Sequence, residues 1–343
     1  LVYVNNYSST AQRSQNFNSN WKFYFGDAGN AQGATFDDSK WEQVSLPHDY
    51  SISQEYSKSM EAESAYLGGG TGWYRKNFTL GSDTQGKRVR IDFDGVYMNA
   101  TVWVNGHEVG IYRDVDLTIT DDVHVDLNGT KVTTPNLETE KGGTVNTDVT
   151  ATVANDSDTA KSVTVRHTVF PKDGSADQSI GTVTTDAQSI AAGETAEIQA
   201  TVPVSNPELW SVDNPSLYTV RTEVLVDGQV TDTYDTEYGF RYFNFDSNTG
   251  FSLNGENMKL KGVCMHHDQG SLGAAAYDSA IDRQVKILKE MGCNSIRVTH
   301  NPAAQDLIDA CNEQGILVVE EAFDTWIKPK NGNSNDYSVW FNQ

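Results

Sequence analysis

Four side chains that can bind polar groups follow three short apolar segments in the last third of the chain. His266 ends the first segment, Arg297 and His300 end the second, and Glu321 ends the third. Imidazole and guanidinium groups donate hydrogen bonds, and a guanidinium fork can hold a carboxylate in its ionised form. These residue types predict a polar binding or catalytic site, provided that the fold gathers the three segment ends.

A metal site is the alternative interpretation of the same region. His266, His267, Asp268 and His300 offer imidazole and carboxylate groups, which are legitimate zinc ligands. The chain has no HxH or HExxH spacing, however, and such spacing is what makes a zinc motif specific. We therefore expect neither zinc nor another cofactor in this region.

The net charge restricts the class of ligand. The 343 residues include 47 Asp and Glu against 25 Lys and Arg, which gives a formal net charge of −22. Such a charge repels phosphate backbones and anionic lipids, so we expect neither nucleic-acid binding nor membrane insertion. A neutral polar ligand such as a sugar remains compatible, and a homo-oligomeric assembly is left open.

The cysteines and the chain start bear on the cellular compartment. Cys264, Cys293 and Cys311 have apolar flanks and no CxxC pairing, which predicts buried free thiols. No signal peptide precedes Leu1, but a mature secreted chain also begins without one. We expect a bacterial protein that is secreted or held at the cell surface rather than cytoplasmic.

The segments that carry the four side chains alternate with helical patterns after residue 250. Strands are predicted at 258–265, 294–298 and 316–319, and helices from Asp278 or Ser279 to Gly292 and over 303–314, with Gly315 closing the second. The first helix has an apolar face made of Ile281, Val285, Leu288 and Met291. This order predicts parallel strands buried on both faces. Three strands cannot close a barrel, so we expect the chain to end within this domain.

Before residue 250, apolar and polar residues alternate in many short runs. Asn105-Gly106 and Asp227-Gly228 are two-residue hairpin turns, because both positions of each tolerate positive φ. Strands at this spacing predict antiparallel sandwiches. We expect two such units, with a boundary around 111–117.

Nine motifs together resemble glycoside hydrolase family 2, and within it the bacterial β-galactosidases. They are LPHDY at 46–50, GWYRK at 72–76, FDGVYMNATVWVNGHEVG at 93–110, IYRDV at 111–115, NPELWSVDNPSLY at 206–218, YGFR at 238–241, GVCMHHD at 262–268, NSIRVTHNP at 294–302 and EEAFDTW at 320–326. The resemblance implies a jelly-roll sugar-binding domain at 1–110, an immunoglobulin-like β-sandwich at 111–243 and the start of a (β/α)8 TIM barrel at 244–343. In the family, further strands separate the NGHEVG and IYRDV motifs, so we expect the first sandwich to lack closing strands.

The resemblance also implies roles for individual residues. His300 and His266 match substrate-binding histidines, Arg297 matches the guanidinium that holds the nucleophile ionised, and Glu321 matches a carboxylate at the barrel mouth. Simple alternation places Arg297 and His300 on opposite faces, so the strand must turn at Thr299. The alternative for Arg297 and Glu321 is structural ion pairing inside the barrel.

Retaining glycosidases need two carboxyl groups about 5–5.5 Å apart. Glu320 and Glu321 cannot form this pair, because neighbouring residues on a strand point to opposite faces. By resemblance, the acid/base and nucleophile glutamates follow Gln343, so we expect this chain alone to be inactive.

Two further positions depend on the resemblance. Asp324 matches a carboxylate that binds Mg²⁺ in some members, but Trp326 stands where a histidine would be, so Mg²⁺ is not expected. Trp326 is instead expected to stack on the apolar face of a sugar, with ordinary packing as the alternative. Gly69 replaces an asparagine that reaches the family's active site, which predicts that this contact is lost.

The predicted function is retaining hydrolysis of terminal β-D-galactosides in carbohydrate metabolism. A β-glucuronidase or β-mannosidase of the same family is the first alternative, because these enzymes share the domain order. A non-catalytic carbohydrate-binding β-sandwich protein is the second, and the predicted strand–helix alternation after residue 250 argues against it.

Overall fold

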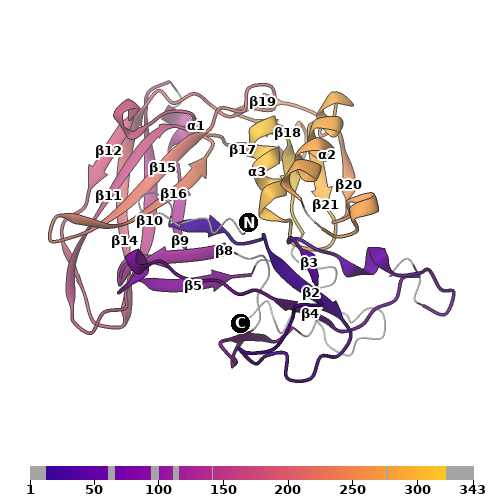
Figure 1. The fold of residues 1–343 in the computed structure, drawn as a ribbon. Coiled ribbons are helices and arrows are strands. Elements are labelled where there is room, and N and C mark those ends of the chain that lie inside the picture. Colours follow the sequence, from indigo (N-terminus) through magenta and orange to yellow (C-terminus); the bar gives the residue numbers. More distant parts are fainter. Residues whose placement is uncertain are drawn as a thin grey trace. The chain divides into compact units, whose positions relative to one another are not determined.

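A computed structural model describes residues 13–60, 66–93, 100–110, 116–140, 142–275 and 277–321 (Figure 1). The chain forms two compact units. The first contains residues up to 136, 140–206 and 218–238, and the second contains 137–139, 207–217 and the residues from 239 onward. Within the described part of the chain, no helix is both long and apolar enough to span a membrane.

The first unit begins with short antiparallel strands. One sheet has the order β1 (Ser14–Asn16), β8 (Asp116–Thr120) and β5 (Arg88–Asp92), and another has the order β3 (Glu42–Val44), β2 (Trp21–Phe25) and β4 (Gly72–Arg75). The 3-10 turns η1 (Tyr50–Ser53) and η3 (Ser82–Thr84) lie in the connections. Phe17, Trp21 and Phe23 are buried, and Ile91 and Ile119 of the other sheet pack against them. These residues of the two sheets therefore form one core.

A separate hairpin pairs β6 (Val102–Val104) with β7 (His107–Gly110). Its turn has φ of +51° at Asn105 and +83° at Gly106, so the predicted hairpin is confirmed. The junction between Gly110 and Ile111, where missing strands were predicted, borders residues 111–115, which lie outside the described residues.

The rest of the first unit is a sandwich of longer antiparallel strands. One sheet has the order β14 (Glu194–Ser205), β10 (Thr144–Asn155) and β9 (Val123–Thr133). The other has the order β12 (Gly181–Thr184), β11 (Lys161–Pro171), β15 (Tyr218–Val226) and β16 (Gln229–Tyr238), with β13 (Gln188–Ile190) also paired to β11. The 3-10 turn η4 (Ala176–Gln178) follows β11. Val145, Val149 and Val153 are all buried, which confirms the predicted alternation.

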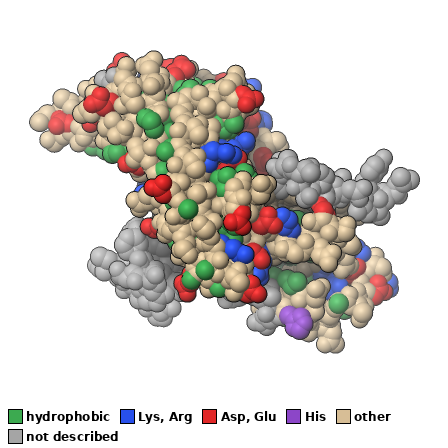
Figure 2. All heavy atoms as spheres, turned by 90° about the vertical axis from the view of Figure 1, so that its left-hand side faces the viewer, with side chains coloured by type: hydrophobic (Ala, Val, Ile, Leu, Met, Phe, Trp, Pro, Cys, Tyr) green, Lys and Arg blue, Asp and Glu red, His purple; other side chains and the backbone are tan. Residues whose placement is uncertain are grey.

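A further feature of this sandwich follows from its sequence. The β15–β16 turn has φ of +52° at Asp227 and +75° at Gly228, as predicted. Figure 2 shows acidic side chains spread over one face of the molecule rather than gathered in one patch.

The sandwich core also contains a buried histidine. His167 Nδ1 lies 3.1 Å from Thr222 Oγ1, and both residues are fully buried. His167 Nε2 has no hydrogen-bond partner among the described residues. Burial lowers the pKa of His167 to about 4, so the ring is neutral at pH 7.

The second unit contains a small antiparallel sheet and a parallel one. The antiparallel sheet has the order β17 (Phe243–Asp246), β18 (Gly250–Leu253) and β19 (Glu256–Asn257). The parallel sheet has the order β20 (Gly262–Met265), β21 (Ser295–Val298) and β22 (Leu317–Val319), joined through α2 (Asp278–Glu290) and α3 (Gln305–Gln314). The 3-10 turn η5 (Gly270–Leu272) lies between β20 and α2, and α1 (Leu137–Glu140) begins in this unit. The predicted change to parallel strands and helices is therefore confirmed.

Both helices pack on one face of the parallel sheet. Ile281 and Val285 of α2 and Leu307 of α3 are buried together with Ile296 and Val298 of β21. Two details of the predicted first helix are wrong. Its N-cap is Tyr277 rather than Asp278 or Ser279, and Met291 is 70% exposed because it follows the last helical turn.

The second helix begins two residues later than predicted and ends as predicted. Ala304 is extended, with ψ of 145°, so α3 begins at Gln305. Gly315 adopts the left-handed conformation at the C-cap, with φ of +72°.

The cysteine prediction holds for one residue of three. Cys311 is fully buried in the helix–sheet core, and burial raises the pKa of its thiol to about 12. Cys264 is exposed and Cys293 is partly exposed, so they are not buried thiols. Cys264 lies on the strand face opposite the helices, which sequence flanks cannot distinguish from the buried face.

The segment 207–217, between β14 and β15, belongs to the second unit. Trp210 is 1% exposed, and its Nε1 donates to the carbonyl of Asn312 at 2.8 Å. Lys289 Nζ donates to the carbonyls of Val212 at 2.5 Å and Gly315 at 2.9 Å. These contacts fasten the segment to the ends of α2 and α3.

Candidate active site

The parallel strands present two different faces. Val263, Met265 and Val298 pack toward α2 and α3. Cys264 is paired in register with Arg297, and the two side chains point to the opposite face, where the Arg297 side chain is 47% exposed. Strand alternation therefore presents the predicted site residues on the face away from the helices.

Arg297 and His300 hold the same carboxylate. Arg297 Nε donates to Oε1 of Glu321 at 2.5 Å, and its Nη2 contacts the same oxygen. His300 Nδ1 lies 3.0 Å from the other oxygen, Oε2. Three of the six predicted site residues are thus brought together, although they are separated by up to 24 positions in the sequence.

The backbone turn that unites them lies at His300. Thr299 still continues the ladder, because its N–H and its hydroxyl both donate to the carbonyl of Met265, at 3.0 and 3.1 Å. His300 then adopts φ of +138°, an unusual conformation for a residue with a Cβ. The predicted turn at Thr299 is therefore wrong by one residue, because Thr299 remains bound to β20.

Histidine 266 extends the cluster. Its ring centroid lies 5.5 Å from that of His300, with an interplanar angle of 75°. His266 follows β20, as predicted, so a fourth predicted site residue lies beside His300. Asp324 and Trp326 lie outside the described residues, and their predicted roles stay predictions.

The charges in the cluster are mutually stabilised. Partial desolvation acts to raise the pKa of Glu321, but the hydrogen bonds from Arg297 and His300 outweigh it and lower that pKa. The hydrogen bond to Glu321 in turn raises the pKa of Arg297. Glu321 is therefore an ionised hydrogen-bond acceptor at neutral pH.

Glu320 points elsewhere. Its Oε1 accepts a hydrogen bond from the backbone N–H of Ala303 at 2.6 Å, just before α3. Glu320 and Glu321 thus serve different partners, as strand alternation predicted. They do not form the carboxyl pair of a retaining glycosidase.

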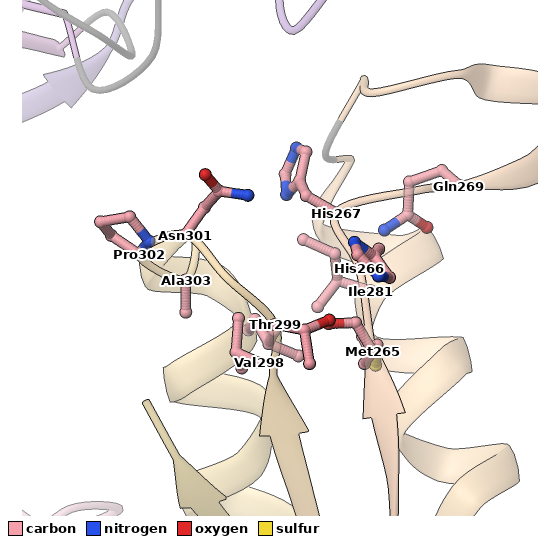
Figure 3. Close-up of a pocket in the computed structure, with 11 residues that line it drawn as sticks. Met265, His266, His267, Gln269, Ile281, Val298, Thr299, Asn301, Pro302 and Ala303 are labelled. Carbon is pink, nitrogen blue, oxygen red and sulfur yellow. The ribbon is translucent and has the colours of Figure 1, made fainter. Parts of the chain in front are cut away.

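A recess opens beside the cluster, between the loops that follow β20 and β21 (Figure 3). Figure 3 shows His267 and Asn301 on either side of its opening, with Met265, Val298 and Thr299 at its base. Asn301 was not among the site residues predicted from the sequence. Its position directly after His300 and before Pro302 is the signal that could have identified it.

The histidine-rich loop after β20 is already hydrogen-bonded internally. His267 Nε2 pairs with the carbonyl of Ala274 at 2.9 Å, and Asp268 Oδ1 accepts from the N–H of Gly270 at 2.6 Å. Among the described residues, no group of three His, Cys, Asp or Glu side chains is arranged to hold a metal ion.

Comparison with known proteins matches two family models. Residues 123–241 match glycosyl hydrolases family 2, and residues 247–338 match the TIM barrel domain of the same family. The four clustered residues all lie within the second match.

Two curated relatives carry the names of different glycosidases. The β-galactosidase BoGH2A of Bacteroides ovatus is 37% identical over 381 residues, which cover 98% of this chain and 44% of that protein. A putative β-glucuronidase of Formosa agariphila is 31% identical and covers 98% of this chain and 36% of that protein. The chain thus spans less than half the length of these relatives. The first alignment is longer than the 343-residue chain, so the B. ovatus protein has residues without a counterpart here.

Solved structures agree with the family models. A glycosyl hydrolase family 2 member from Bacteroides cellulosilyticus is 31% identical, with a TM-score of 0.86, and covers 97% of this chain and 48% of that one. The Bacteroides uniformis β-glucuronidase 2, covalently bound to cyclophellitol-6-carboxylate aziridine, is 28% identical, with a TM-score of 0.80, and covers 93% and 43%.

Proposed function

This chain belongs to glycosyl hydrolase family 2, and we propose that the full-length protein is a retaining β-galactosidase that hydrolyses terminal β-D-galactosides. The observation that carries the proposal is the convergence of Arg297, His300 and Glu321 at the ends of adjacent parallel strands in the barrel segment. Active sites of such barrels lie at the carboxyl ends of the strands.

In this proposal the cluster orients the sugar rather than breaking the bond. The rings of His266 and His300 contact sugar hydroxyls, and Glu321 fixes the orientation of the His300 ring through Nδ1. The acid/base and nucleophile carboxylates come from parts of the full-length protein outside the described residues. Among the described residues, the adjacent acids Glu320 and Glu321 at the strand end have different partners and cannot fill those roles.

A covalent intermediate is supported by a relative. The B. uniformis β-glucuronidase 2 has been captured covalently bound to a cyclophellitol aziridine. We extend a covalent, two-step route to this protein because it belongs to the same family. Retention of configuration follows from such a route, since each step inverts the anomeric carbon.

Two observations favour a galactoside over a glucuronide. The B. ovatus β-galactosidase is 37% identical to this chain, against 31% for the F. agariphila putative β-glucuronidase. A glucuronate carboxylate also needs a cationic partner. Among the described residues of this cluster, the cation is Arg297, and it is already paired with Glu321. β-Glucuronidase therefore remains the second candidate.

The test compares nitrophenyl β-galactoside, β-glucuronide and β-mannoside with the full-length protein. We expect kcat/KM to be highest for the galactoside, with NMR showing β-galactose as the first-formed product. Faster hydrolysis of the glucuronide would reject the galactosidase assignment but retain the family's reaction. Galactose binding without hydrolysis of any substrate would instead support a carbohydrate-binding protein.

A further inference from the structure

The loop that carries His300 is held in an unfavourable conformation. A φ of +138° lies outside the regions that residues with a Cβ normally occupy. Such a conformation persists only where surrounding contacts impose it, and it commonly occurs at functional sites. The contacts on both sides of His300 therefore determine where its ring lies.

Two of these contacts precede or involve His300 itself. Thr299 is 3% exposed, and both its N–H and its hydroxyl bind the carbonyl of Met265. The His300 ring binds Glu321 through Nδ1. These contacts fix the entry to the turn and the ring, but they leave the exit of the turn free to relax.

The exit is held by Glu320. Its carboxylate accepts the N–H of Ala303 at 2.6 Å, three residues after His300 and directly after Pro302. A hydrogen bond to an ionised acceptor is stronger than one between neutral groups. Pro302 has no N–H of its own, so the N–H of Ala303 is the first donor after Asn301 that can tie the exit to β22.

We propose that Glu320 is a positioning residue for His300, which acts by holding residues 301–303 against the end of β22. Adjacent carboxylates on one strand end then secure one histidine from two sides. Glu321 binds the ring on the open face, and Glu320 binds the backbone beyond it. This inference rests on the proposed function, because it assigns His300 a role in sugar binding.

The test uses Glu320→Ala and Glu320→Gln in the full-length protein, with Glu256→Ala as the matched control. Glu256 is an exposed acid on β19, which belongs to the antiparallel sheet rather than to the parallel one. Glu320→Ala removes the acceptor, whereas glutamine keeps a carbonyl oxygen there. We expect alanine to lower kcat for the best nitrophenyl glycoside by about tenfold or more, since small misplacements of positioning groups have effects of this size. KM and the melting temperature should change little, and glutamine should restore most of kcat.

A kcat of Glu320→Ala equal to that of the control would overturn the proposal. So would a glutamine variant as impaired as the alanine variant, because the acceptor would then not be the cause. A crystal structure of Glu320→Ala provides a readout that does not depend on the substrate. Residues 300–303 should shift in it, and an unchanged loop would reject the inference even if the galactosidase assignment were correct.

Discussion

The imidazole Nδ1 of His300 lies 3.0 Å from Oε2 of Glu321, while the other oxygen of that carboxylate is bound by Arg297. The ionised carboxylate favours a hydrogen on Nδ1 of His300, because it can only accept. In the neutral ring, Nε2 is then an acceptor. The carboxylate therefore fixes both the orientation of the ring and the polarity of its outer edge.

Replacing His300 by alanine in the full-length protein should weaken transition-state binding. We expect kcat/KM to fall by a factor that corresponds to about 2–4 kcal/mol of activation free energy, which is the usual effect of losing one such hydrogen bond. Steady-state kinetics with the best nitrophenyl glycoside measures this, with circular dichroism as the folding control. An unchanged kcat/KM would show that His300 does not contribute to transition-state binding.

Replacing Glu321 by glutamine should release Arg297 and reorient His300. We expect kcat/KM to fall by about 100-fold, because both groups lose their fixed positions. The exposed acid Glu290 on α2 gives the control substitution, Glu290→Gln.

The pH dependence of the wild type should reflect the same contacts. The hydrogen bonds lower the pKa of Glu321, so its ionised form persists below the ordinary value of 4.5. Any loss of kcat/KM that is due to protonation of Glu321 should therefore have its midpoint below that pH. A Glu321-dependent loss with a midpoint above pH 4.5 would contradict the assignment.

His167 should make the stability of the chain sensitive to acid. Its pKa is about 4 in the fold, against 6.5 for an exposed histidine. Above pH 6.5 the ring is neutral in both states and contributes nothing to the pH dependence. Between pH 6.5 and 4 only the unfolded chain takes up a proton, so the free energy of unfolding falls by about 3 kcal/mol in all.

Urea unfolding of the wild type and of His167→Leu at several pH values isolates this effect from that of the carboxylates. The wild type should lose more stability than the variant as the pH falls from 7 to 4. His107→Gln, at an exposed position, should behave like the wild type. Parallel curves for the wild type and His167→Leu would show that the buried ring is not the cause.

Two glycines that follow helices should differ in their tolerance of alanine. Both have positive φ, +72° at Gly315 and +89° at Gly292. A Cβ at Gly315 would lie 2.2 Å from the carbonyl oxygen of Val212, whereas one at Gly292 meets nothing within 4 Å. Gly292→Ala should cost about 1–2 kcal/mol for the left-handed backbone, and Gly315→Ala about 2–5 kcal/mol because of the added clash. Equal losses in the free energy of unfolding, measured with urea, would show that the 207–217 segment leaves room for a Cβ at Gly315.

The sequence by itself determined the local elements and the set of candidate residues. Alternation located the sandwich strands, positive-φ turn residues located both hairpins, and glycine located the end of α3. The different partners of Glu320 and Glu321 were also expected from alternation, because neighbouring residues of an extended segment point to opposite sides.

Only the tertiary structure decided which groups bind one another. No local pattern shows that Arg297 and His300 meet on Glu321, since that contact depends on strand register and on the backbone of a single residue. The hydrogen bond from the N–H of Ala303 to Glu320 and the close approach of the Val212 carbonyl to Gly315 also depend on tertiary packing. Short-range sequence preferences describe one segment at a time. These contacts join different segments, which come close to one another only when the helices pack on the sheet.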